Sequence, residues 1–253
     1  MHSAAFNRKA AEVKEQYVAD VSDYRKYALL RALTDGGEHK LGVCWMLTPD
    51  DSGPDGKKLE YLQRPNEFRP HDPDLFDHLK VVVEHHPERT LEAIESAGLI
   101  ADAEYFNEIL LDDLKGREAY WAACKSKFAA CDIVFFDPDN GLETSLVRGR
   151  KNSSKFIYFD EIASFFQAGK SLLIYQHFPR VQRDVFIESC RARIAKALGI
   201  DDVWACTTKH VVFLLVVHPE QQASFGPRAE AVASIFDPEF IRGYRLGRTE
   251  QAT

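Results

Sequence analysis

Short apolar runs alternate with amphipathic segments along this chain of 253 residues. Continuous apolar runs are typical of strands buried on both faces of a sheet, whereas apolar residues at three- or four-residue steps are typical of helices. The predicted strands span residues 41–48, 104–111, 133–136, 155–159, 171–176, 203–207 and 211–217. The predicted helices span residues 8–35, 73–84, 87–97, 115–130, 161–168 and 181–198.

Strands that alternate with helices indicate a mostly parallel sheet that is covered by helices on both faces. The last two strands are separated only by residues 208–210, so we expect them to form an antiparallel hairpin. The pattern therefore predicts an α/β protein with a single three-layer, Rossmann-like domain over residues 1–253. We expect a helical insertion at about residues 70–100 and, from about residue 225, a polar tail that either docks as a helix or stays mobile.

Composition narrows the class of protein. No apolar run approaches the ~20 residues that span a bilayer, and the first residues lack the apolar core of a signal peptide. The five cysteines are scattered, which favours reduced thiols in a cytoplasmic protein and disfavours a zinc site. The net charge of −7 lacks the basic footprint of most nucleic-acid-binding proteins. We therefore expect a cytoplasmic protein with no membrane partner.

The sequence Asp137-Pro138-Asp139-Asn140-Gly141 follows directly after the clearest predicted strand. Ligands of open α/β sheets bind outside the carboxyl ends of the strands, so this loop is the first candidate for a site. Pro138 stiffens the turn, and Asn140-Gly141 tolerates a positive φ. The alternative interpretation is an ordinary turn with solubilising acids.

Other polar side chains also follow predicted strands, and in a parallel sheet they would meet at one edge. Such a cluster could handle protons, hold a cation or bind an amine. Asp160 and Glu161 could instead cap the next helix, because acids favour helix N-termini. The residues are Thr48, Asp50, Asp51, Asp160, Glu161, Gln176 and His177.

The first predicted helix carries a third group of charged residues. Asp20, Asp23 and Lys26 are spaced to share one helix face. They could belong to a site, but a surface ion pair explains the spacing equally well.

These three places together resemble the methyltransferases that methylate an adenine N6 of large-subunit ribosomal RNA. Those proteins open with a helix carrying Asn-Phe-Ala-Asp-Val-Leu-Lys-His, which is similar to residues 21–30 here. Their catalytic Asp-Pro-Pro-Tyr follows a strand, as residues 137–140 do. The antiparallel end of the predicted sheet is similar to the class I methyltransferase fold. The chain also resembles a bacterial family of unknown function with Gly-Asp-x-x-Asp-x-x-Lys-Tyr, Leu-Gly-Val-x-Trp and Asp-Pro-Asp-Asn-Gly-Leu-Glu.

The methyltransferase resemblance implies roles for individual residues. Lys26, beside Asp23, would approach the carboxylate of S-adenosylmethionine, and the loop after Thr48 would wrap this cofactor. Asp137 and the Pro138 carbonyl would accept hydrogen bonds from the target amine of a nucleic acid. These interactions would orient the nitrogen toward the methyl group, and such placement does most of the work in this chemistry. The positions implied for the cofactor are Asp23, Lys26, Thr48, Asp50, Asp51 and Gly53, and those for catalysis are Asp137, Pro138, Asp139 and Asn140.

The chain departs from that pattern in two places, which keeps other functions open. Its counterpart of the glycine-rich cofactor loop is reduced to Ser52-Gly53-Pro54-Asp55-Gly56. Asp139 and Asn140 replace the second proline and the tyrosine, so a stacking ring would have to come from Phe135, Tyr158 or Tyr175. The added carboxylate favours a second hypothesis, a Mg²⁺-dependent nuclease or phosphoesterase. Its metal ligands would be Asp137, Asp139 and Glu161, with Asp50 or Asp51. Lys26 or His177 would assist the reaction. A third hypothesis is a non-catalytic binding protein on the same fold, possible because fold does not fix function.

Overall fold

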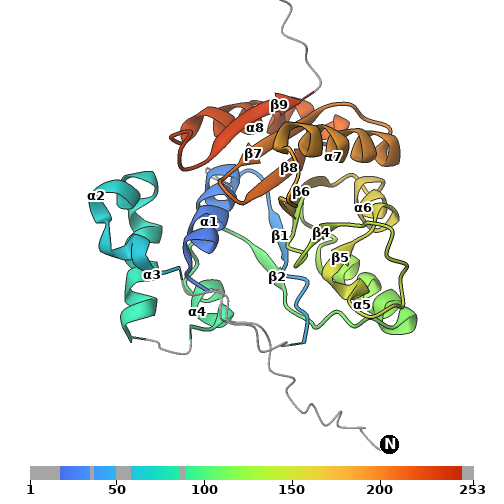
Figure 1. Ribbon diagram of the computed structural model, residues 1–253, viewed down its shortest axis with the longest axis horizontal. Helices are drawn as coiled ribbons and strands as arrows, with labels where there is room; N and C mark the ends of the chain where they lie inside the picture. Colours follow the sequence, from blue (N-terminus) through green and yellow to red (C-terminus); the bar gives the residue numbers. More distant parts are fainter. Residues whose placement is uncertain (1–17, 35–36, 50–57, 86–88, 247–253) are drawn as a thin grey trace, which may run out of the picture.

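The computed structural model describes residues 18–34, 37–49, 58–85 and 89–246. Seven strands form one mixed sheet in the order β2-β1-β3-β6-β8-β7-β9, and β4 and β5 form a separate two-stranded sheet (Figure 1). The strands are β1 Leu41–Cys44, β2 Glu104–Phe106, β3 Ile133–Phe136, β4 Gly141–Leu142, β5 Phe156–Ile157, β6 Ser171–His177, β7 Val203–Thr207, β8 Val211–Val216 and β9 Arg242–Leu246. The helices are α1 Val21–Thr34, α2 Pro65–Phe68, α3 Pro73–His85, α4 Leu91–Glu95, α5 Leu114–Lys127, α6 Phe159–Phe166, α7 Arg183–Leu198 and α8 Gln222–Ile235, with 3-10 turns at Glu60–Gln63, Arg69–His71, Ser153–Lys155 and Pro219–Gln221.

The direction of the strands matches the expected α/β class. Strands β2, β1, β3 and β6 are parallel neighbours. Strand β8 lies between β6 and β7 and runs antiparallel to both, so the predicted C-terminal hairpin is confirmed. Strand β9 pairs antiparallel with β7 and adds an edge strand beyond the hairpin. Five of the seven strands in the main sheet therefore point one way.

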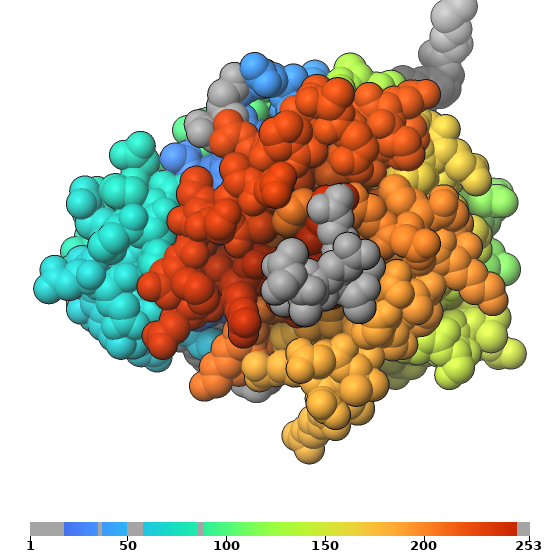
Figure 2. All heavy atoms as spheres, turned by 90° about the horizontal axis from the view of Figure 1, so that it is seen from above, coloured from blue at the N-terminus to red at the C-terminus, as the bar shows by residue number. Residues whose placement is uncertain are grey.

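Helices cover both faces of the sheet. Along β3, Ile133 and Phe135 face a core shared with α1, α3 and α8, whereas Val134 and Phe136 face a second core shared with α5, α6 and α7. This alternation follows from the two-residue period of a strand, and burial on both faces explains the continuous apolar runs in the sequence. Figure 2 views the molecule from the side of α7, α8 and β9, which spread over this end beside α2 and α3.

The predicted strand at 155–159 is wrong in its place and its length. Only β5 is extended there, and it pairs with β4 rather than with the main sheet. The backbone N–H of Asn140 donates to the Lys155 carbonyl, which brings β5 beside the loop that follows β3. Phe159 is the first residue of α6, so Asp160 and Glu161 do not follow a strand of the main sheet.

Several other boundaries differ from the sequence pattern. Strand β1 ends at Cys44, because Met46 adopts a left-handed conformation with φ of 49° that a strand cannot continue through. Strand β2 keeps three residues of the predicted run at 104–111. Helix α1 starts at Val21, and residues 8–17 of the predicted first helix lie outside the described residues. Within the described segments, no helix has the length and apolar character needed to cross a bilayer.

The predicted polar tail contains most of α8 and all of β9. Strand β9, Arg-Gly-Tyr-Arg-Leu, was missed because it lacks the apolar run of a buried strand and lies at the exposed edge of the sheet. Its Gly243 packs against α8, where a Cβ atom would come within 2.4 Å of the Ala233 Cα. Arg245 pairs with Asp202 and covers the Trp204 ring at 5.2 Å.

Candidate functional site

A cavity of about 580 Å³ lies at the carboxyl ends of β1, β3 and β6. The chain leaves β1 for β2 on one side and later returns to β3 on the other, so the sheet changes its winding direction between β1 and β3. Open α/β sheets bind ligands at this kind of switch point. The cavity walls come from the segments after β1 and β3, from α1, and from the ends of β6 and β8.

The base of the cavity is a buried ion cluster that joins α1 to β3. Lys26 Nζ lies 2.6 Å from Asp137 Oδ2 and 3.0 Å from Asp23 Oδ1. The Tyr27 hydroxyl donates to Asp23 Oδ2 at 3.0 Å. The Asp137 N–H donates to the Cys44 carbonyl at 3.0 Å, which fixes the start of the loop beside β1. Sequence spacing predicted Asp23 and Lys26 on one face, and the structure adds that Asp137 joins them.

Burial and charge set the protonation of this cluster. Burial raises the pKa of Asp137 to about 6, against the opposing effect of Lys26, and the charges of Asp23 and Asp139 raise it further. Burial acts to lower the pKa of Lys26, but the negative charges of Asp137 and Asp23 outweigh the effect of burial. The pKa of Lys26 therefore lies above its ordinary value. The pair therefore carries a permanent cation beside a carboxyl group that titrates within the working range of many enzymes.

The surroundings of Lys26 add a second role to the one that the resemblance implies for it. Its ammonium group already forms ion pairs with Asp23 and Asp137. Two aromatic rings complete its surroundings, with the Trp45 centroid 5.7 Å and the Tyr175 centroid 5.3 Å from Nζ. Lys26 also holds Asp137 in place and lowers its pKa.

The loop after Asp137 is held in a fixed shape. Thr48 Oγ1 donates to Asp139 Oδ2 at 2.9 Å, which ties the loop to the segment after β1. Gly141 has φ of +99°, as the Asn-Gly pair predicted, and a Cβ there would lie 2.3 Å from the Gln176 side chain. Gln176 accepts from the Leu142 N–H and donates to the Asn140 carbonyl. Gln176 therefore fixes the backbone of the loop on both sides of Gly141.

Strained backbone lies on two sides of the cavity. Ala19 and Met46 have φ of 66° and 49°, although neither is glycine. Such conformations cost of order 1–3 kcal/mol each and persist where surrounding structure enforces them, often at functional sites. Ala19 precedes Asp20, and Met46 separates Trp45 from Leu47 in the cavity wall.

Asp20 has a structural role as well as a place in the cavity wall. Its Oδ1 accepts from the N–H groups of Ser22 at 2.7 Å and Asp23 at 3.0 Å, so it caps the first turn of α1. Burial, together with the charge of Asp23, raises the pKa of Asp20 to about 6. The cap fixes the start of the helix that carries Asp23 and Lys26.

The cofactor loop expected from the sequence is described only at its ends. Thr48 lines the cavity and is buried, and Lys58 lines it at the other end of the loop. Asp50, Asp51 and Gly53 lie outside the described residues.

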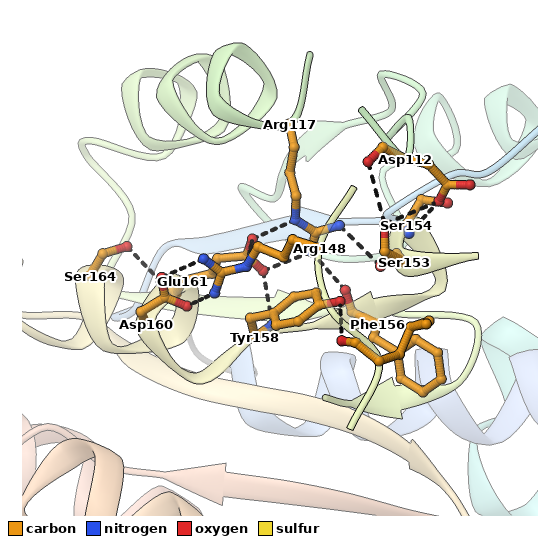
Figure 3. A network of polar contacts seen from close by, with 11 residues as sticks. Asp112, Arg117, Arg148, Ser153, Ser154, Phe156, Tyr158, Asp160, Glu161 and Ser164 are labelled. Carbon is orange, nitrogen blue, oxygen red and sulfur yellow. Dashed lines mark hydrogen bonds and ion pairs between the residues drawn. The ribbon is translucent and has the colours of Figure 1, made fainter. Parts of the chain in front are cut away.

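Asp160 and Glu161 belong to a different polar network, which corrects their expected place at the edge of the sheet (Figure 3). Glu161 receives Arg117 at 2.6 and 2.8 Å and also accepts from the Tyr158 N–H, so it caps α6. Asp160 pairs with Arg148. The structure therefore supports the helix-capping interpretation for Glu161, whereas Asp160 forms an exposed ion pair in the first turn of α6.

This position of Glu161 separates it from the other two carboxylates of the alternative metal site. Glu161 does not line the cavity that contains Asp137 and Asp139. Among the described residues, no three His, Cys, Asp or Glu side chains are grouped so that they could hold a metal ion. Glu161 is thus not grouped with Asp137 and Asp139, and Asp50 and Asp51, the other acids expected to help hold Mg²⁺, lie outside the described residues.

The network around Arg117 supports the candidate loop from the far side. Besides Glu161, Arg117 donates to the Ser153 carbonyl at 3.1 Å and the Phe156 carbonyl at 2.7 Å, and its guanidinium stacks on Tyr158 (Figure 3). These carbonyls flank Lys155, and β5 pairs with β4 directly after Asn140. Arg117 therefore fixes the strand pair that ends the loop.

Sequence reasoning missed several residues of the cavity. Of the three rings considered, only Tyr175 lines it, since Phe135 lies in the core and Tyr158 belongs to the Arg117 network. The missed residues occupy turns and segment ends, where no periodic pattern marks them. They include Trp45, Lys58, Lys155, Phe178 and His210. His177 was expected, and its Nε2 lies 3.2 Å from the Tyr175 hydroxyl.

Comparison of the chain with models of protein families, with curated proteins and with solved structures found no match in any of the three.

Proposed function

We propose that the protein is an S-adenosylmethionine-dependent methyltransferase that acts on an amine of a nucleic-acid base. The observation that carries the proposal is the placement of Asp137-Pro138. This pair stands at the carboxyl end of β3, in the cavity at the switch point of the sheet, with Asp137 fixed by Lys26.

The cavity suits such a cofactor in size and in charge. Its volume of about 580 Å³ falls within the range of about 300–1,000 Å³ that is usual for small-molecule sites. Adenosylmethionine carries a positive sulfonium and an ammonium group, and the wall offers carboxylates at Asp137 and Asp139 and rings at Trp45 and Tyr175. When bound, adenosylmethionine supplies an activated methyl group.

The residues of the chain would bind and orient the amine. Ionised Asp137 accepts one N–H of the amine, and the Pro138 carbonyl accepts the second, so the nitrogen lone pair is left to point at the methyl group. Lys26 keeps Asp137 ionised and in place. With a pKa of about 6, the Asp137 carboxylate is also basic enough to take the proton that the methylated nitrogen releases.

The aspartate and asparagine that replace the second proline and the tyrosine have structural roles. Asp139 binds Thr48, and the Asn140 backbone binds Lys155 and Gln176, so both residues shape the loop. Stacking of the base falls to Tyr175 or Phe178, which line the same cavity.

The test is methyl transfer from labelled adenosylmethionine to a panel of nucleotides and oligonucleotides that carry exocyclic amines. Asp137→Asn keeps the size of the side chain but loses the carboxylate, so we expect the transfer rate to fall by about 10²–10⁴-fold. Asp160→Asn is the matched control, because it removes an exposed carboxylate of the Arg148 pair outside the cavity.

Full activity in the Asp137→Asn protein would show that the loop is not the reaction centre. An equal loss in Asp160→Asn would show that the effect of Asp137→Asn is not specific to the cavity.

A further inference from the structure

The mouth of the cavity carries a different charge from its base. Lys58, His177 and His210 line the mouth, and all three are exposed, whereas the carboxylates of the wall come from α1 and from the loop after β3. The surrounding cations are numerous on this side. Lys58, Lys209 and Arg183 all act to lower the pKa of His210, after the effect of partial burial.

The fold places the two histidines beside each other. His177 is the last residue of β6 and pairs with Val211 of β8, and His210 directly precedes that strand. The Phe178 N–H donates to the His210 carbonyl at 3.1 Å, which closes the strand pair at this end. The Tyr175 hydroxyl contacts His177 Nε2 at 3.2 Å and so orients the ring.

Neighbouring groups add to the positive charge at the mouth of the cavity. Arg183, at the start of α7, donates to the Lys209 carbonyl at 2.7 Å and lies over the Phe178 ring at 5.3 Å. Among the described residues, neither Lys58 nor His210 has a carboxylate within ion-pair distance. Asp139 is the carboxylate that acts on His177, and Lys26, His210 and Lys58 oppose it.

We propose that Lys58, His177 and His210 form a phosphate-binding site at the mouth of the cavity. Lys58 offers an ammonium group and each imidazole offers an N–H donor in the same cavity, and a phosphate group has three oxygens that can accept from them. A carboxylate ligand would use fewer of these donors. Phosphate binding would also give Lys58 a negative partner, which no carboxylate among the described residues supplies within ion-pair distance.

This site defines the substrate of the reaction more closely. This inference rests on the proposed function: the amine would bind at Asp137 while a phosphate of the same substrate binds at the mouth. The chemical class is therefore a phosphorylated amine in which both groups fit one cavity, as in a nucleotide whose base carries an exocyclic amine.

The experiment titrates the full chain with inorganic phosphate, and then with adenosine 5′-monophosphate and adenosine, in the absence of adenosylmethionine. Binding is followed by calorimetry and by the imidazole signals in NMR spectra. Lys58→Gln with His210→Gln is compared with Lys196→Gln, which removes an exposed lysine in the last turn of α7, away from the cavity. Melting temperatures check that each variant is folded.

We expect the double variant to bind phosphate and the monophosphate at least tenfold more weakly, and Lys196→Gln to bind within twofold of the unaltered protein. We also expect the monophosphate to bind more tightly than adenosine. Equal affinity of the monophosphate and adenosine, or no loss in the double variant, would overturn the phosphate site.

A final comparison identifies the source of the phosphate. Tighter binding of the monophosphate than of a short adenine oligonucleotide supports a free nucleotide, and the reverse supports a nucleic-acid strand. Because no adenosylmethionine is present, failure of the phosphate site is distinguishable from failure of the proposed methyl transfer.

Discussion

At the scale of single residues, the pairing of Lys26 with Asp137 governs the chemistry of the cavity. A buried carboxyl without a partner would stay protonated at neutral pH and could not accept a hydrogen bond from an amine. Lys26 Nζ lies 2.6 Å from Asp137 Oδ2 and opposes that effect, and the resulting pKa of Asp137 is about 6. The carboxylate form therefore predominates above that pH.

This pKa gives the reaction a defined pH dependence. We expect kcat/KM for methyl transfer to rise with pH up to about 6 and to level off above it, because only ionised Asp137 accepts from the amine. The measurement is a rate profile between pH 4.5 and 8. Asp20 has a similar pKa, so the profile is repeated with Asp20→Asn, which keeps the helix cap. A flat profile, or loss of the inflection in Asp20→Asn, would count against Asp137.

Removal of the lysine charge should move the same inflection. In Lys26→Met the burial of Asp137 is no longer opposed, so its pKa rises, and we expect the inflection to shift upward by about one unit or more. The apolar Met side chain fits a site walled by Trp45 and Tyr175. An unchanged inflection would mean that Lys26 does not set the protonation of Asp137.

At the scale of elements, the loop after β3 is supported by residues far from it in sequence. The β4–β5 pair ends the loop, and Arg117 of α5 binds the carbonyls of Ser153 and Phe156 beside β5. Arg117 is 2% exposed, so its charge depends on Glu161 for compensation. Loss of one partner leaves an uncompensated buried charge, whereas loss of both does not.

We therefore expect Glu161→Gln to lower the free energy of unfolding by about 3–5 kcal/mol. The double variant Arg117→Met with Glu161→Leu should lose considerably less. Urea denaturation measures both. Asp77→Asn, which breaks the exposed pair with Arg69, is the control and should leave stability unchanged within error. If the double variant were less stable than Glu161→Gln, the ion pair itself would be the stabilising interaction.

Elements with a strong period were predictable, and those set by distant contacts were not. The continuous apolar run Ile-Val-Phe-Phe gave β3 with its observed bounds, and Gly199 ended α7 as expected. Strand β5 was displaced, because its partner is the turn after Asn140 rather than the main sheet. Strand β9 escaped notice because an edge strand needs no apolar run.

At the scale of the whole molecule, the order of the strands determines where the cavity lies. The reversal of winding between β1 and β3 opens the crevice, and α1 closes it with Asp23 and Lys26. The sequence could place Asp137 and Thr48 near one edge, because each follows a predicted strand, whereas Lys26 was linked to them only by the resemblance. It could not place Lys58 or His210, since their positions depend on how separate turns fold together.

The most direct test of the account is calorimetric titration of the full chain with S-adenosylmethionine. We expect saturable heat with one site per chain, unchanged in Lys196→Gln. An absence of heat at millimolar ligand, with a protein shown to be folded by its near-ultraviolet circular dichroism, would contradict it.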